Sequence, residues 1–275
     1  MNDIGSKVKK FYEKTPFNFP DSASIIEKKI RDRNLILDYA PLTIEKLYKS
    51  KVIELGCGSG WLSLCLSHYY KCEVTAIDFN QKSINIAQAA QKLLKTDVRF
   101  ICADFTKEFL NERFKWVISV GVLHHTAHAM INLDQLIKRY LDDQGNILVG
   151  LYHLHGRRPF LDKIEKLKNS NQDEAVLMDA YRKMDQRFLL NEEEYFLSWF
   201  ADQVMHPFES QHTLAEVINV FDKNKITHRG TSINQFKSEN LLDIIENERA
   251  FEIKAKKNIQ KGIFDPGFFT VLGER

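Results

Sequence analysis

Short apolar runs alternate with amphipathic stretches in the middle of this chain, between residues 51 and 155. In the stretch 81–95 the apolar residues recur every three or four positions, as on the buried face of a helix packed on a sheet. The alternation predicts an α/β fold, with a parallel sheet and right-handed crossovers. Strands are predicted at 51–55, 73–78, 97–102, 115–121 and 146–152, and helices at 60–70, 81–95 and 128–141.

The alternation stops after residue 155. Three polar helical patterns then follow one another without a strand between them, which predicts an inserted helical cap. A helix at 212–222 and strands at 225–231 and 268–272 resume the core. We therefore divide the chain into 1–50, an N-terminal helical arm or lid; 51–155, a Rossmann-like core; 156–211, the helical cap insertion; and 212–275, the completion of the core sheet.

Composition and charge limit the class of protein. The chain has 275 residues, of which 44% are apolar and 28% charged, and its net charge of +2 leaves no electrostatic footprint for nucleic acid. No apolar run approaches the ~20 residues that span a bilayer, and the N-terminus has no apolar signal region. The four cysteines form no C-x-x-C pair, which argues against a zinc site or a disulfide framework. We expect a soluble, cytoplasmic protein.

A glycine-rich turn follows the first predicted strand. The segment Val52–Gly60 ends in three alternating glycines, and a helical pattern starts at Trp61. Such a turn brings bare backbone N–H groups and the positive end of a helix up to a ligand. Asp78 ends the next strand, where a carboxylate can receive two ribose hydroxyls. The spacing is G-x-G-x-G and not the G-x-G-x-x-G of dinucleotide enzymes, which argues against a nicotinamide cofactor.

The turn Glu54-Leu-Gly56-Cys57-Gly58-Ser-Gly60 resembles the first motif of the class I S-adenosylmethionine-dependent methyltransferases, (D/E)-x-G-x-G-x-G. The resemblance continues in Ala103-Asp104-Phe105 and in the segment from Val120 to His125, and it is strong over residues 50–155. It implies a Rossmann-like sheet of seven strands whose last strand runs antiparallel, and S-adenosylmethionine as the cofactor.

The resemblance also assigns cofactor-binding roles at the strand ends. Glu54 helps to fix the loop and the amino end of the cofactor, Asp78 takes the ribose hydroxyls, and Asp104 accepts from the adenine amino group. Plainer interpretations stay open, since the glycines can form an ordinary tight turn, either aspartate can cap a turn or a helix, and Phe79 can belong to the core instead of lying on adenine. The predicted cofactor-binding residues are Glu54, Gly56, Cys57, Gly58, Gly60, Asp78, Phe79, Ala103, Asp104, Phe105, Val120 and Leu123.

Two histidines leave the fourth predicted strand beside the expected methyl position. Methyl transfer from a sulfonium is an in-line displacement, so positioning supplies much of the rate, and a base is needed only when the acceptor starts protonated. His124 or His125 could take that proton, or could contact the ligands without doing so. Tyr152, Arg157 and Arg158 follow the fifth strand, where the acceptor pocket is expected. The arginines can pair with a carboxylate or phosphate of the substrate, or hold the cap through salt bridges.

A second cluster of functional residue types lies near the end of the predicted cap. His206, Glu209 and His212 could ligate a metal, but they straddle a proline-containing turn and not one helical face, so no metal site is predicted. We expect His206 to act in catalysis and the other two to line a hydrogen-bonded acceptor pocket, with a structural hinge as the alternative. The aromatic segment that begins at Tyr12 could close over the same opening as a lid, or be buried as an arm on the core.

The full layout is also similar to a group of bacterial methyltransferases with unassigned small-molecule acceptors, through Tyr12…Pro16-Phe17, Leu123–Thr126 and Asp202–His212. The sequence therefore predicts methyl transfer to a small polar metabolite or biosynthetic intermediate, with oxygen favoured over nitrogen as the acceptor atom. The alternatives are a tRNA-modifying enzyme, an enzyme that uses the cofactor for other chemistry, and a noncatalytic cofactor-binding partner subunit. We expect a monomer or a homodimer that binds neither nucleic acid nor membrane.

Overall fold

A single seven-stranded sheet organises the protein. The computed structural model describes residues 4–14, 17, 22–39, 44–107, 110–170, 173–185, 193–237, 239–263 and 265–275. The strand order is β3-β2-β1-β4-β5-β7-β6, and β7 runs antiparallel to both of its neighbours. This confirms the predicted fold class and its antiparallel last strand. The strands are β1 (Lys51–Leu55), β2 (Glu73–Asp78), β3 (Val98–Cys102), β4 (Phe114–Val120), β5 (Leu141–Tyr152), β6 (Thr227–Thr231) and β7 (Phe268–Glu274).

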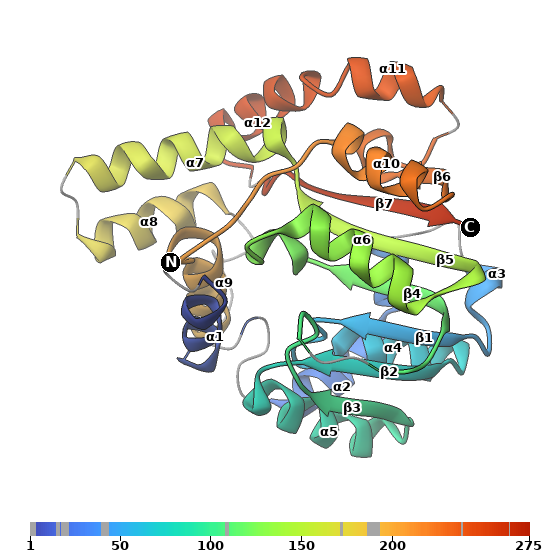
Figure 1. Ribbon diagram of the computed structural model, residues 1–275. Coiled ribbons are helices and arrows are strands. Elements are labelled where there is room, and N and C mark those ends of the chain that lie inside the picture. Colours follow the sequence, from blue (N-terminus) through green and yellow to red (C-terminus); the bar gives the residue numbers. More distant parts are fainter. Residues whose placement is uncertain are drawn as a thin grey trace.

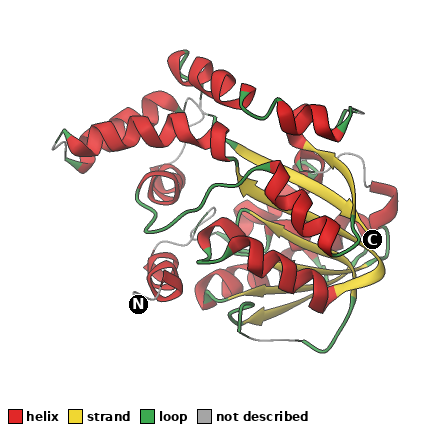
Figure 2. Ribbon diagram, turned by 45° about the horizontal axis from the view of Figure 1, so that its top comes forward, coloured by secondary structure: helices red, strands yellow, loops and turns green. Residues whose placement is uncertain are grey.

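Helices cover both faces of the sheet (Figures 1 and 2). Successive strand residues point to opposite faces, so that Ile53 belongs to the apolar cluster of one face while its neighbour Val52 belongs to that of the other. Side chains of α6 (Ala129–Tyr140) and α10 (Leu214–Lys223) complete the first cluster. The second cluster is completed by α2 (Ala23–Asp32), α4 (Trp61–Tyr70) and α5 (Gln81–Leu94).

Three consecutive helices occupy the region of the predicted cap. They are α7 (Leu154–Asn169), α8 (Glu174–Met184) and α9 (Glu193–Val204). Their apolar faces form a cluster of their own around Phe160, Tyr181, Phe196 and Phe200, so the helices stabilise one another apart from the sheet. Because α7 starts two residues after β5 ends, the cap is tied to the carboxyl edge of the sheet.

Residues between β6 and β7 form helices where a hairpin would suffice. These are α11 (Leu241–Glu246) and α12 (Ala250–Gln260), preceded by the short turn η4 (Ser232–Asn234). Helix α12 packs along α7, which places this insertion on the outer side of the cap (Figure 1). An open cavity of about 540 Å³ lies between η4 and these two helices, away from the glycine turn.

The N-terminal helix α1 (Ile4–Lys14) lies beside α9 at the carboxyl ends of the strands (Figure 1). The hydroxyl of Tyr12, in its last turns, donates to Asp202 of α9 over 2.7 Å. Pro16 of the predicted aromatic segment lies outside the described residues. The remaining short elements are η1 (Leu35–Asp38), α3 (Ile44–Leu47) and η2 (Leu123–His125). Within the described ranges, no helix has the length and apolarity required to cross a bilayer.

Candidate active site

The glycine turn is held open by backbone hydrogen bonds to the neighbouring strand. The N–H of Gly56 donates to the carbonyl of Ile77 over 2.7 Å, and that of Gly58 donates to Asp78 Oδ2 over 2.8 Å. Both glycines have positive φ, which favours glycine. A Cβ on Gly56 would come within 2.4 Å of Val122, whereas one on Gly58 would meet nothing within 4 Å. Gly58 therefore borders open space at the ends of the strands, where a ligand can approach the backbone.

Cys57 takes part in this turn through its backbone and through a long contact from its thiol to the carbonyl of Gly58, at 3.7 Å. Its side chain is buried in the apolar cluster behind the loop, while its N–H donates to the carbonyl of Ile77 over 3.0 Å. Burial raises the pKa of the thiol well above its usual value, so Cys57 is a packing residue with no thiolate chemistry at neutral pH.

Asp78 is positioned as a ribose-binding carboxylate would be. Its two oxygens accept one backbone N–H each, from Gly58 and from Asn80, both over 2.8 Å. Burial raises the pKa of Asp78, and the two backbone donors oppose the shift. Each oxygen keeps a lone pair, so the oriented carboxylate can still accept from two further hydroxyls.

Glu54 lies beneath the glycine turn and is almost fully buried. Its carboxyl accepts a hydrogen bond from the Ser63 hydroxyl of α4, and burial raises its pKa to about 8. At neutral pH this carboxyl is therefore largely protonated in the free protein. A cationic amino group nearby would favour the charged form and lower the pKa again.

The raised pKa of Glu54 predicts a stability that falls as pH rises. Between pH 4.5, the ordinary pKa of a glutamate, and about pH 8, the folded protein keeps the proton on Glu54, whereas the unfolded chain releases it. We expect the urea-unfolding free energy of the wild type to drop by up to a few kcal/mol across that window relative to Glu54→Gln. Glu73→Gln, which changes an exposed glutamate of β2, should keep the wild-type profile. Parallel profiles for wild type and Glu54→Gln would contradict the assignment.

The loop after β3 presents Asp104 with its carboxylate already engaged. One oxygen accepts from the backbone and hydroxyl of Thr106, over 3.0 and 2.6 Å, and Lys107 lies 3.2 Å from the other. Burial raises the pKa of Asp104, but these hydrogen bonds and the lysine outweigh burial and hold the pKa below its usual value. Asp104 therefore stabilises the turn, as the plainer interpretation expected. Its second oxygen is ionised and half-exposed and can still accept from an adenine amino group.

The other predicted cofactor residues differ in what they expose. Phe105 is buried in the core, so only its backbone can face a ligand. Ala103 is half-buried, and its N–H donates to the carbonyl of Asp78 over 2.9 Å, which joins the second and third strand ends. Phe79 is half-buried with its ring 6.3 Å from that of Tyr12. Gly60 packs against Phe100 and Ala87, Leu123 is fully buried, and Val120 is half-buried at the end of β4.

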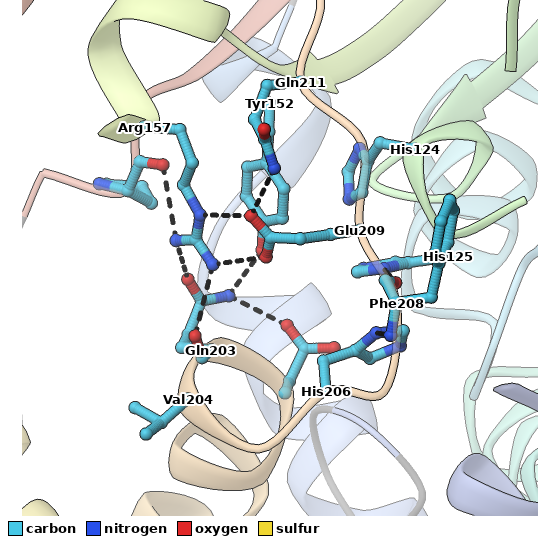
Figure 3. A network of polar contacts seen from close by, with 12 residues as sticks. His124, His125, Tyr152, Arg157, Gln203, Val204, His206, Phe208, Glu209 and Gln211 are labelled. Carbon is cyan, nitrogen blue, oxygen red and sulfur yellow. Dashed lines mark hydrogen bonds and ion pairs between the residues drawn. The ribbon is translucent and has the colours of Figure 1, made fainter. Parts of the chain in front are cut away.

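His124 is buried with both ring nitrogens unpaired. Its side chain is 1% exposed, and neither Nδ1 nor Nε2 has a hydrogen-bond partner among the residues that the structure describes. The ring stacks on Tyr152 with 4.0 Å between centroids, and the Arg157 guanidinium lies 4.0 Å from the centre of the same tyrosine ring (Figure 3). Because an unpaired buried imidazole is costly, a polar group of a ligand would be stabilised here.

Arg157 is the centre of a buried polar network (Figure 3). Its guanidinium binds both oxygens of Glu209, over 3.0 and 2.7 Å, and also donates to the side chain and the carbonyl of Gln203 and to the carbonyl of Pro266. Burial disfavours the charge, but Tyr152 and Glu209 more than compensate and raise the pKa of the guanidinium. Protein acceptors use the donors of Arg157, so this residue joins α7 to the end of α9 and to Glu209 within the cap, reaches the core through Pro266, and offers nothing to a substrate carboxylate.

Arg158 and His212 were also predicted to bind the substrate, but they are not arranged as two residues that contact one substrate would be. Arg158 is exposed on α7. His212 is engaged with Ser210 Oγ at 2.9 Å, while Glu216 lies 3.5 Å from its other nitrogen. Glu209 is held by Arg157 and by Gln211, over 2.9 Å. The segment after α9 is therefore an ordered strap, held by bonds within itself, as from Gln211 to Glu209, and by bonds to the turn after β4 and to α7.

Tyr12 links the N-terminal helix to both sides of the site. Its carbonyl accepts from the Asn80 side chain over 2.7 Å, and its hydroxyl donates to Asp202 over the same distance. Its ring centroid lies 5.3 Å from that of His206 and 6.1 Å from that of His125. Helix α1 therefore lies over the strand ends as a lid would, joined to the cofactor edge through Asn80 and to the cap through Asp202.

The three predicted catalytic histidines are brought together. His125 and His206 lie with 3.8 Å between ring centroids, and His124 is 4.2 Å from His125. Burial lowers the pKa of His125 to about 4 and that of His206 to about 3, and it lowers the pKa of His124 well below the ordinary value, with neighbouring histidines adding to the effect for His124 and His206. All three imidazoles are thus neutral at pH 7. They are suited to hydrogen bonding or ligation and poorly suited to holding a proton.

Asn80, Asp202 and Gln203 belong to the site but not to the predicted set of site residues. Asn80 is both the N-cap of α5 and the donor to Tyr12, and only the first role can be recognised in the sequence. Gln203 bridges Asp202, Tyr152 and Arg157, over 2.8, 2.7 and 2.7 Å. Its place in the Asp202–His212 element was a signal, but a bridging role cannot be assigned without knowing what the cap faces.

The fold and the glycine turn together define a Rossmann-like methyltransferase. Residues 52–145 match the family described as methyltransferase domain. A malonyl-[acyl-carrier protein] O-methyltransferase of Bacillus cytotoxicus is 26% identical over 138 residues, which cover 48% of this chain and 46% of that protein. An (S)-tetrahydroprotoberberine N-methyltransferase of Eschscholzia californica is 29% identical over 116 residues, covering 38% and 33%. The match thus spans half or less of the length of either relative.

Solved structures show the same fold. PKMT2 from Rickettsia typhi superposes with a TM-score of 0.58 at 16% identity, over 84% of this chain and 51% of that one. The matched residues 52–145 form a methyltransferase domain of the S-adenosylmethionine-dependent kind, and its cofactor is S-adenosylmethionine.

Proposed function

We propose that this protein transfers the methyl group of S-adenosylmethionine to a small polar metabolite or biosynthetic intermediate, at oxygen in preference to nitrogen. One observation carries the proposal: among the residues that the structure describes, the imidazole of His124 is unpaired and buried in the turn after β4, against Tyr152 at the end of β5 and beside Ser210 of the segment after α9. A site enclosed on these sides suits a small ligand better than a long polymer. A reducing, cytoplasmic setting belongs to the proposal, supported by the four free cysteines.

The proposed cofactor-binding roles belong to residues at the ends of the strands. The glycine turn and Asp78 hold the methionine and ribose parts of the cofactor, and Asp104 with the backbone of Phe105 holds adenine. In the transfer, the acceptor oxygen forms a bond to the methyl carbon as the carbon–sulfur bond breaks, which leaves S-adenosylhomocysteine and a proton. His124 accepts a hydrogen bond from the acceptor hydroxyl and fixes its direction of attack, so its contribution is positioning.

The two relatives are named for different acceptor atoms. One is named as an O-methyltransferase and the other as an N-methyltransferase, so similarity does not choose between them. The neutral imidazoles favour a hydroxyl, because the unpaired nitrogens of His124 provide both a donor and an acceptor for it.

The test uses the purified chain with methyl-labelled S-adenosylmethionine and either a bacterial small-molecule extract or tRNA. We expect label in a low-mass product together with S-adenosylhomocysteine. Label in tRNA would replace this proposal by a tRNA-modifying function, and cofactor binding with no labelled product would point to a noncatalytic subunit. His124→Ala should lower turnover by about 10²-fold with unchanged cofactor affinity. His155→Ala, a half-buried histidine of α7, is the matched control. Full turnover in His124→Ala would place the acceptor elsewhere.

A further inference from the structure

Three side chains at the junction of lid, core and cap have the composition of a metal site. His125, Asp202 and His206 each offer one ligand atom, and these atoms lie within 4.8 Å of one another. His125 comes from the turn after β4, and the other two come from the end of α9 and the residues just beyond it (Figure 3). This set differs from the ligands considered from the sequence, His206 with Glu209 and His212, because local spacing does not reveal that His125 lies beside His206.

The hydrogen bonds around two of these side chains already orient them for ligation. His125 Nδ1 lies 3.0 Å from the carbonyl of Phe208, so it carries the ring proton and leaves the lone pair of Nε2 free. Asp202 accepts from Tyr12 at one oxygen and from Gln203, over 2.8 Å, at the other. At metal centres, hydrogen bonds to the far side of the ligand side chains fix the tautomer of a histidine and the direction in which the ligand atoms point.

His206 supplies an unpaired nitrogen. Its Nε2 is buried and has no hydrogen-bond partner within the described part of the chain, while Nδ1 accepts from the N–H of Phe208 over 3.2 Å. Ligation through Nε2 moves the ring proton to Nδ1 and gives up that long contact. The loss of one long neutral hydrogen bond is small beside the affinity of imidazole and carboxylate ligands for a transition metal.

The charge balance of the site also favours a cation. Arg157 and Glu209 neutralise each other through their bidentate contact. Among the residues that the structure describes, Asp202 forms no ion pair, and its oxygens accept only from the neutral groups of Tyr12 and Gln203. A buried carboxylate beside neutral imidazoles is stabilised when a cation is bound between them.

We propose that His125, Asp202 and His206 bind one divalent transition-metal ion. Two imidazoles and one carboxylate suit Zn²⁺ or Fe²⁺ and leave coordination positions open. Binding of a Zn²⁺ at about 2.0–2.2 Å from its nitrogen and oxygen ligands would draw together ligand atoms that now lie within 4.8 Å of one another. The proposal that the site binds a metal does not depend on which acceptor the enzyme uses. The role of the metal rests on the function proposed above: it would lower the pKa of an acceptor hydroxyl beside His124.

The test titrates ZnCl₂ by calorimetry into the full chain without a histidine tag, after treatment with a chelator. We expect one equivalent to bind, and we expect affinity to fall on the order of a hundredfold or more in His206→Ala and in the near-isosteric Asp202→Asn. His155→Ala should bind as the wild type does. Replacement by Co²⁺ should give the visible absorption of a low-coordinate nitrogen–oxygen site, lost in both variants.

Binding of S-adenosylmethionine is measured on the same samples. Retained cofactor binding shows that each variant is folded, and it separates failure of this proposal from failure of the proposed function. Absence of stoichiometric Zn²⁺ binding by the wild type, or equal affinity in wild type and Asp202→Asn, would overturn the assignment. In that case the cluster is a hydrogen-bonding part of the acceptor pocket.

Discussion

Replacing Arg157 by methionine should lower the free energy of unfolding by about 3–5 kcal/mol. The guanidinium is fully buried and binds both oxygens of Glu209, so its removal leaves a buried carboxylate without a counter-charge. It also strips Gln203 and the carbonyl of Pro266 of their donor. Urea denaturation measures the loss, and the neighbouring exposed Arg158→Met should stay within about 0.5 kcal/mol of the wild type.

A double variant separates the charge effect from lost packing. Adding Glu209→Gln to Arg157→Met removes the unpaired carboxylate, so part of the lost stability should return. If Arg157→Met alone unfolds like Arg158→Met, the network of Figure 3 contributes nothing to holding the cap on the core. That outcome would also reopen a substrate-binding role for Arg157.

Replacing Asp78 by alanine should weaken binding of S-adenosylmethionine by about 2–4 kcal/mol, a factor of roughly thirty to a thousand. The ribose hydroxyls would lose a charged acceptor, and the N–H groups of Gly58 and Asn80 would lose the carboxylate that fixes the turn. Calorimetry with S-adenosylmethionine measures the effect, and Asp143→Ala, at an exposed aspartate of β5, is the control.

Asp78→Asn distinguishes these two contributions. The amide keeps one acceptor oxygen but loses the charge, so we expect a loss near tenfold. Equal affinity for S-adenosylmethionine in the wild type and Asp78→Ala would show that the ribose does not bind at the end of β2. Weakening of the same size in both variants would assign the effect to charge, with little part for the geometry of the turn.

Most of the core could be predicted because its signals are local. The apolar runs and amphipathic stretches mark the elements within a residue or two over most of the sheet, since periodicity depends on neighbours in the chain. One boundary differs: β5 starts at Leu141 and not at residue 146, because Leu141 pairs with Phe114 across an irregularity in the register. The pairing partner of a residue cannot be recognised from its own surroundings in the sequence.

The amino-acid sequence by itself determined the strand–turn–helix with its three glycines and the two acids at neighbouring strand ends, because these depend on short-range backbone chemistry. The class of cofactor followed from the resemblance of the same short motif to a known family. Only the tertiary structure decided what the cap faces. It joins Tyr12 to Asp202 across 190 positions and Arg157 to Glu209 across 52, and it turns His125 toward His206. Such contacts follow from how α1 and the cap pack on the sheet, and no local spacing encodes that packing.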